Sequence, residues 1–301
     1  MKPATESFYA EAVQRVIEHV ASHLDEALAL DTLAAQACLS PFHFHRVFRG
    51  MVGETPVELG RRLRLERAAW RLVHTSLPVT AIAFDAGYET HEAFSRTFRV
   101  NYAESPSEFR RRSRARIELA APCGVHFSDD GHVPPFIPRN SGGITMNVEL
   151  ANYPELRVAA VRHIGPYIRI NEAFARLDEL AVPKRLFQWP GQMMVALFYD
   201  DPDTTPADQL RSDAGLVVPN DLALPDGLTE QCIPAGEYAT TMHVGPYEQL
   251  GDAWARFMGE WLPASGRRLG PGVSYEIYHN TPMDTPKEKL RTEIRIPLAP
   301  E

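Results

Sequence analysis

The sequence predicts a multidomain protein, in which an all-α domain with two tandem helix-turn-helix units precedes an α+β domain. Three observations predict this organisation. The chain has 301 residues, more than one domain usually holds. Each half contains its own internal repeat, one with an offset of 50 residues and one with an offset of 80. A stretch rich in proline and glycine, residues 119–144, separates the halves. We expect domains at 8–116 and 146–299 and a linker at 117–145.

The bulk composition excludes several classes of protein. No run of about eighteen apolar residues is present, and the first twenty residues lack the layout of a signal peptide, so we expect a cytoplasmic protein without a membrane partner. The three cysteines are too far apart for a disulfide framework or a zinc site. Cys123 with His126 and His132 lacks a second cysteine pair. We therefore expect no metal, no cofactor and no catalytic residue.

The 50-residue repeat predicts two helix-turn-helix units. "FHRVFRGMVGETPVEL" (44–59) aligns with "FSRTFRVNYAESPSEF" (94–109), and a short helical pattern ending in a turn precedes each copy, at 30–40 and 78–90. In the second copy, Gly87 supplies the left-handed backbone position that the turn of such a unit requires.

The periodicity of each second helix separates a buried from an outward face. Phe44, Val47, Phe48 and Met51 recur at helical spacing and form a buried stripe. The outward positions hold side chains suited to bases and phosphates: Phe42, His45, Arg46 and Arg49 in the first unit, and Glu92, Ser95, Arg96 and Arg99 in the second. We expect them to contact double-stranded DNA, although exposed arginines on a helix are often only a solvated face.

The charge distribution supports a contact with a polyanion. The whole chain has a net charge of −8, yet residues 40–116 hold 14 Arg, no Lys and 8 acidic residues, a net +6. Residues 60–73, "GRRLRLERAAWRLV", predict a helix between the two units. This helix would set the spacing of the two recognition helices, which must lie about 34 Å apart to enter successive major grooves.

These residues resemble a known family. The strings "AAQACLSPFHFHRVFR" and "IAFDAGYETHEAFSRTFRVNYAESPSEFRR" are similar to the DNA-binding domain of AraC/XylS-type transcription regulators, over residues 8–112. The resemblance implies which side chains face bases: Phe42, His45 and Arg46 in the first unit, and His91, Glu92 and Arg96 in the second.

The 80-residue repeat predicts two strand-helix-strand-strand modules. His-Gly-Pro-Tyr occurs in "RHIGPY" (162–167) and in "MHVGPY" (242–247), followed in each copy by the same apolar helical stripe. Short β-type runs precede and follow each helix. Two such modules side by side share an approximate two-fold axis, and a groove along that axis is a natural ligand site. His163 and His243 recur in both copies, which favours a structural role over a catalytic one.

One carboxylate breaks the symmetry of the modules. In "VSYEIYH" Glu276 stands mid-strand, whereas the first module has Ala196 or Leu197 at the matching position. A buried carboxylate favours a positively charged guest, so we expect Glu276 to bind a cationic effector. The aromatic candidates for contact with such a guest are Tyr278, Tyr199, Trp254 and Trp261. The alternative is an exposed glutamate on an edge strand.

This half resembles a second family. "H-x-G-P-Y" twice, "YDDPDTTPADQLRSDAGLVV" and "SYEIYHNTP" are similar to the GyrI-like (SbmC/Rob-type) small-molecule-binding domain, over residues 146–299. In that family the glutamate matching Glu276 is the usual ligand carboxylate, often set against lipophilic cations, which implies multidrug sensing.

Together the two resemblances imply a transcription activator that responds to an aromatic, cationic effector and works with RNA polymerase. Two alternatives remain open. GyrI-like domains include hydrolases, and Glu276 with Tyr278 or Tyr247 could act as a general base. The acidic C-terminal domain could instead be a protein-interaction module. The sequence leaves the operator, the effector and the oligomeric state undetermined.

Overall fold

The computed structural model describes residues 3–112, 116–139, 146–187, 192–200 and 205–300. These residues form two compact units: the described residues within 8–40 and 47–139 make one, and those within 3–7, 41–46 and 146–300 make the other. No helix within the described ranges is long and apolar enough to cross a membrane.

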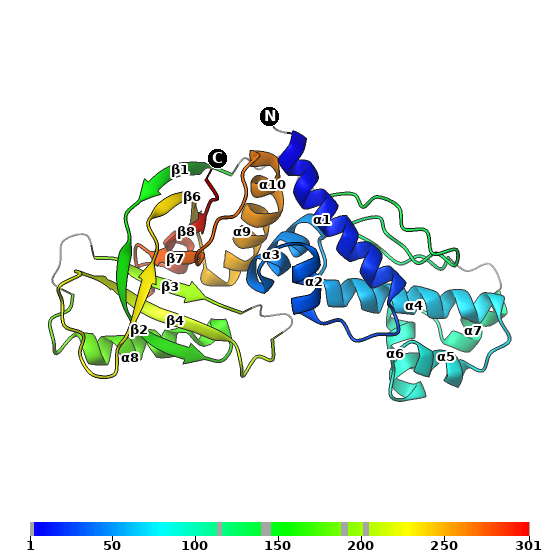
Figure 1. Cartoon of the computed structure of the whole chain (residues 1–301). Coiled ribbons are helices and arrows are strands. Elements are labelled where there is room, and N and C mark those ends of the chain that lie inside the picture. Colours follow the sequence, from blue (N-terminus) through cyan, green and yellow to red (C-terminus); the bar gives the residue numbers. More distant parts are fainter. Residues whose placement is uncertain (1–2, 113–115, 140–145, 188–191, 201–204, 301) are drawn as a thin grey trace. The chain divides into compact units, whose positions relative to one another are not determined.

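The N-terminal half is helical, as the sequence predicts. Its described residues form seven α-helices, labelled in Figure 1: α1 Pro3–Ser22, α2 Leu30–Gln36, α3 Pro41–Val52, α4 Pro56–His74, α5 Val79–Asp85, α6 His91–Tyr102 and α7 Pro106–Arg112. The two helix-turn-helix units are α2 with α3 and α5 with α6, and α4 is the connecting helix between them.

The turn between α5 and α6 has the backbone that its glycine predicts. Gly87 has φ +83°, and Thr90 caps α6 by accepting a hydrogen bond from the Ala93 amide at 3.1 Å. Phe94 and Phe98 are fully buried in a core that α4, α5 and α7 also line. This arrangement confirms the inward face predicted for α6.

The matching turn of the first unit reaches the same backbone without a glycine. Cys38 follows the end of α2 at φ +57°, a left-handed conformation that side chains other than glycine rarely adopt. The sequence gives no signal of this turn geometry, because the 50-residue offset places Ala37 opposite Gly87 and Cys38 opposite Tyr88.

The residues that the two copies share after each recognition helix form the start of the next helix. Thr55 and Glu58 form a capping box at the start of α4, with Glu58 accepting from the Thr55 amide at 2.8 Å. Ser105 and Glu108 repeat the same box at the start of α7, where Glu108 accepts from the Ser105 amide at 2.9 Å. The 50-residue repeat therefore encodes a helix start as well as a helix.

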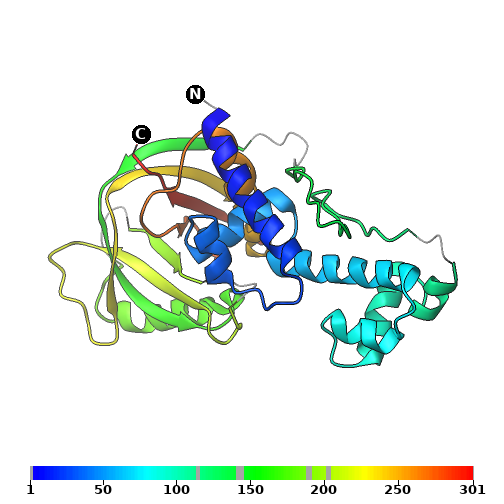
Figure 2. The same cartoon turned by 45° about the vertical axis from the view of Figure 1, so that its right-hand side comes forward.

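The C-terminal half is an α+β domain built on one strongly curved sheet (Figures 1 and 2). Its strands are β1 Val148–Tyr153, β2 Leu156–Ile164, β3 Met194–Phe198, β4 Arg211–Val218, β5 Thr229–Ile233, β6 Gly236–Val244, β7 Tyr275–Tyr278 and β8 Arg291–Pro297. They lie in the order β1-β6-β8-β7-β3-β4-β2-β5, and every pairing is antiparallel. The helices of this half are α8 Asn171–Ala181, α9 Leu250–Arg256 and α10 Leu262–Ser265, with a π-helical turn Phe257–Trp261 between the last two.

The strand pairing contains the predicted two-fold symmetry. The pairings of β2 with β4 and of β3 with β4 recur 80 residues later as those of β6 with β8 and of β7 with β8: Leu197 pairs with Asp213, for example, as Ile277 pairs with Glu293. The two modules meet where β3 pairs with β7, and there Ala196 lies directly opposite Glu276. Because these two positions are 80 residues apart, the pseudo-two-fold axis passes between them.

Two strands were not predicted, and they exchange between the modules. β1 precedes β2 in the chain but pairs with β6 of the second module, and β5 precedes β6 but pairs with β2 of the first. Tyr153 pairs with Gly236 as Ile233 pairs with Leu156, so the exchange also follows the 80-residue offset. Each module is therefore completed by a strand from the other.

The predicted linker is ordered over its described residues before position 140. Residues 117–139 lie along the helical unit, where the Arg139 amide donates to Met51 O at 2.7 Å and the Phe136 amide donates to Gln14 at 3.0 Å. Residues 140–145 lie outside the described residues.

Candidate functional site

Glu276 lies on β7 with both carboxylate oxygens held by aromatic donors. Trp254 Nε1 of α9 donates to Glu276 Oε1 at 2.6 Å, and the Tyr278 hydroxyl donates to Glu276 Oε2 at 2.7 Å. Only 3% of Glu276 is exposed, so it is not the exposed edge-strand glutamate of the alternative interpretation. The structure thus brings three of the five predicted ligand residues together.

Burial sets the electrostatics of this group. Burial raises the pKa of the Glu276 carboxyl above its ordinary value, against the two hydrogen bonds from Trp254 and Tyr278, which lower it. Burial raises the pKa of the Tyr247 and Tyr278 hydroxyls, and the nearby Glu276 charge raises it further. Both phenols therefore stay protonated. A carboxylate in this position gains from a cation, because a cation offsets the cost of its desolvation.

Aromatic rings from both modules pack against Tyr278, one of the two donors to the carboxylate. The Tyr278 ring meets the Phe174 ring of α8 edge-on at 5.5 Å and the Tyr247 ring at 5.5 Å. Phe174 was recognised in the sequence only as part of an apolar helical stripe. Its offset of 80 residues from Trp254 is the signal that could have placed it here. We refer to Glu276, Trp254, Tyr278, Tyr247 and Phe174 as the axial cluster.

Of the two remaining predicted aromatic ligands, Tyr199 lies elsewhere. The Tyr199 ring packs with the cluster on the opposite face of the sheet, where its hydroxyl donates to Asp213 at 2.7 Å and Arg162 stacks 4.9 Å from the ring. Strand alternation explains why the prediction for Tyr199 was wrong. Ala196 and Phe198 face the helices, so Tyr199, the residue after Phe198, faces the other side of the sheet. Trp261 packs against the Phe257 ring at 5.3 Å in the π-helical turn.

The repeated histidines have the structural role that their recurrence favours. His163 Nε2 lies 3.1 Å from Pro166 O, and His243 Nε2 lies 3.2 Å from Pro246 O. In both copies the intervening glycine has a positive φ, +140° at Gly165 and +146° at Gly245. The His-x-Gly-Pro string thus closes a tight turn before each helix.

The candidate nucleic-acid surface is clearest on α6. Glu92, Arg96 and Arg99 are exposed on the face opposite Phe94 and Phe98, as predicted. His91 and Ser95 are half-buried on the same side, with Ser95 Oγ 3.5 Å from His91 Nε2. This face offers guanidinium groups for bases and phosphates.

The first recognition helix, α3, differs from the prediction. Arg49 is exposed and Arg46 is half-buried, but His45 is only 3% exposed instead of lying on an open face. Residues 41–46, which include His45, belong to the compact unit that contains residues 141–301. The side chain of Phe42 lies outside what the structure describes.

Among the described residues, no group of three or more His, Cys, Asp and Glu side chains is arranged to hold a metal ion. Cys123 and His126 instead bond to Glu54 and Glu66 of the helical unit.

Family comparisons match both halves. A model of the GyrI-like small molecule binding domain matches residues 146–299, and a model of a helix-turn-helix domain matches residues 33–112.

Known proteins match each half separately. The DNA gyrase inhibitor of Yersinia enterocolitica is 34% identical over 129 residues, which cover 41% of this chain and 80% of that protein. Regulatory protein SoxS of Salmonella typhimurium is 35% identical over 104 residues, which cover 35% of this chain and 97% of SoxS. Among solved structures, EcmrR in its complex with DNA (EcmrR-RPo) matches with a TM-score of 0.41 and 22% identity, over 50% of this chain and 57% of the EcmrR chain.

Proposed function

Because this chain belongs to the family of AraC-type helix-turn-helix regulators with a C-terminal GyrI-like small molecule binding domain, we propose that it is a transcription activator that senses a lipophilic cation. The helical half reads a specific DNA sequence. The C-terminal half binds the effector at the axial cluster, and effector binding shifts an equilibrium between states that differ in their affinity for it.

The observation that carries the effector proposal is the environment of Glu276. Its carboxylate is buried, its two oxygens accept from the neutral donors Trp254 and Tyr278, and aromatic rings from both modules pack against the Tyr278 ring. Neither donor carries a positive charge. The Arg46 guanidinium, 4.3 Å from the centre of the Trp254 ring, partly offsets the effect of burial on the Glu276 pKa, and a bound cation adds to this compensation and also stacks on the rings. An aromatic cation satisfies both requirements at once.

A thermal-shift measurement on the full chain tests this proposal. Tetraphenylphosphonium serves as the cationic probe and triphenylphosphine oxide as the neutral probe of similar shape. At about 100 times its dissociation constant the cation should stabilise the folded state by about 2.7 kcal/mol, while the neutral compound has little effect.

The matched variants are Glu276→Gln and the exposed Glu288→Gln. The first should lose the response to the cation, because the amide carries no charge, and the second should keep it. Equal responses to the two probes, or a full response in Glu276→Gln, would show that the cation is not bound through this carboxylate. Hydrolysis of an added ester or epoxide by the purified protein, measured separately, would instead support the hydrolase alternative.

The DNA proposal rests on the exposed arginines of α6. A preferred duplex is first selected from a random library with the unmodified protein. Arg96→Ala should weaken binding to that duplex by about 1–3 kcal/mol and relax its sequence preference, because arginine pairs with guanine in two hydrogen bonds. Affinity should also fall steeply with salt, because binding releases counterions from the phosphates. RNA polymerase is the partner that the activator proposal requires, and a transcription assay on the selected duplex tests it.

A further inference from the structure

Residues 117–139, which we call the strap, lie between the two regions that the family models match. The strap contacts both helix-turn-helix units. At one end, the Tyr102 hydroxyl of α6 donates to Ile117 O at 2.6 Å. At the other end, the Arg139 amide donates to Met51 O of α3 at 2.7 Å. The strap therefore runs from the second unit, along α4, to the first.

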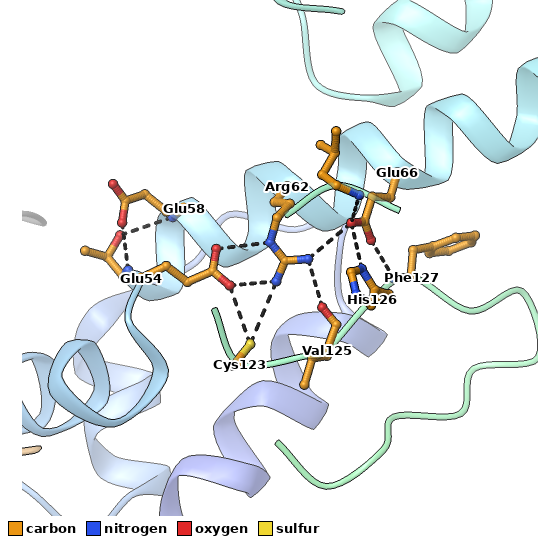
Figure 3. Close-up of polar contacts among 10 residues, drawn as sticks. Glu54, Glu58, Arg62, Glu66, Cys123, Val125, His126 and Phe127 are labelled. Atoms are coloured by element: carbon orange, nitrogen blue, oxygen red, sulfur yellow. Dashed lines mark hydrogen bonds and ion pairs between the residues drawn. The ribbon is translucent and has the colours of Figure 1, made fainter. Parts of the chain in front are cut away.

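Arg62 of α4 joins the strap to the turn between α3 and α4 (Figure 3). Its Nε and Nη2 donate to the two oxygens of Glu54 at 3.1 and 2.6 Å, and its Nη1 donates to Val125 O of the strap at 2.8 Å. The Arg62 side chain is only 8% exposed. A buried guanidinium is tolerated only when such partners replace water, and the strap supplies one of them.

Glu66, one turn further along α4, depends on the strap more strongly (Figure 3). Its carboxylate accepts from the Leu119 amide at 3.0 Å and from the Phe127 amide at 2.8 Å, and His126 Nδ1 lies 3.0 Å from Oε1. The side chain is 1% exposed. Three of the groups around this carboxylate thus belong to the strap, against one from its own helix, Arg62 at 3.3 Å.

The strap can leave this position without stranding buried charges. Glu66 and Arg62 are four residues apart on one helix, so they remain an ion pair in water once the strap moves away. The apolar side chains that the move would expose are Cys123, Val125 and Phe136, with Ile117 and Leu119 at the edge of the core and Phe127 edge-on to Trp70. Polar contacts that water can replace are the property of an element with two accessible states.

We propose that the strap is a working part of the DNA-binding unit, and that Glu66 and Arg62 are positioning residues that hold α4 and both recognition helices in the arrangement that reads two DNA half-sites. This inference rests on the proposed reading of DNA. The strap is also part of the covalent connection to residues 146–299.

The test uses full-length Glu66→Gln. The amide group turns one acceptor oxygen into a donor, so it faces the Leu119 or Phe127 amide donor to donor and should loosen the strap. Hydrogen exchange of peptides covering 117–127 should become faster. Affinity for the selected two-half-site duplex should fall about fivefold or more, while affinity for the same duplex with one half scrambled stays unchanged.

The matched control is Glu26→Gln, a change of the same kind at an exposed position of the same helical unit, outside the strap, which should alter neither measurement. Unchanged exchange in Glu66→Gln, or an equal loss of affinity on both duplexes, would overturn the inference. If Glu66→Gln does not fold, His126→Ala removes one strap contact from the partly exposed side and is held to the same two criteria. Failure to select any duplex would count against the DNA proposal, and the exchange measurement would still judge the strap contact.

Discussion

In the first C-terminal module β3 presents Ala196 to the pseudo-two-fold axis, whereas in the second module β7 presents Glu276. The aromatic residues near these two positions are also more polar in the second module. Phe174 of α8 corresponds to Trp254 of α9, and Phe198 of β3 corresponds to Tyr278 of β7, so each apolar ring of the first module is replaced by a ring with a hydrogen-bond donor. The carboxylate and both of its donors therefore belong to one copy.

The other face of the sheet diverges in the same way. Four positions that are small or aliphatic in the first module are aromatic or charged in the second. The pairs are Val158 and Tyr238, Val195 and Tyr275, Gly215 and Arg295, and, on the exchanged strands β5 and β1, Ile233 and Tyr153. Arg295 stacks 3.6 Å from the centre of the Tyr153 ring and donates to Glu293 at 2.6 Å. The comparison teaches that the duplicated backbone tolerates two unrelated interiors, because strand pairing uses main-chain groups alone.

The largest expected effect comes from removing the charged interior of the second module. Arg295→Ala leaves Glu293 buried without its guanidinium, and we expect a loss of about 3–5 kcal/mol in the free energy of unfolding. Urea denaturation of the full chain measures it. A loss below about 1 kcal/mol would mean that His279, 2.8 Å from Glu293, is a sufficient partner and that the two interiors are energetically alike.

A smaller effect is expected at the matching position of the first module. A Cβ on Gly215 would lie 2.4 Å from Val158 Cγ1, so Gly215→Ala should cost about 1–3 kcal/mol through overpacking. Gly251→Ala is the control, because nothing lies within 4 Å of a Cβ there, and it should not destabilise. Equal melting temperatures for the two variants would show that the first module has room for a larger side chain.

A third test makes the axial cluster more symmetric. Tyr278→Phe gives β7 the ring that β3 carries at Phe198 and removes one hydrogen bond to Glu276. A hydrogen bond to a charged group contributes about 1.5 kcal/mol or more, so we expect affinity for tetraphenylphosphonium to change by about tenfold. Titration calorimetry measures it, with Phe198→Tyr as the reciprocal variant. An unchanged affinity would separate the hydroxyl from ligand binding.

The smallest effect concerns pH. Burial holds the pKa of Glu276 above its ordinary value, so the folded protein keeps this proton more tightly than the unfolded chain does. The contribution of Glu276 to stability is therefore fully present below the ordinary glutamate pKa and is lost as pH rises through the raised pKa. Glu276→Gln should remove this decline, seen as a flatter dependence of the melting temperature on pH. Parallel curves for the two proteins would contradict it.

Much of the candidate site was accessible from the sequence because repeats expose what they do not share. The 80-residue offset identified Glu276 as a lone carboxylate, and period-two alternation placed Tyr278 beside it on the same face. The same offset applied to Phe174 and Trp254 would have completed the cluster. Tyr199 was placed wrongly, since an aromatic residue just past the end of a strand carries no mark of the face that it joins.

The sequence by itself determined the two tandem helix-turn-helix units, the two modules and the carboxylate at their axis, because local periodicity and repetition specify helices, strands and their copies. Only the tertiary structure decided the exchange of β1 and β5, the left-handed turn at Cys38 and the packing of the strap on Arg62 and Glu66. These features depend on contacts between residues far apart in the chain or on a backbone conformation that the side chain does not favour, and no local pattern records either.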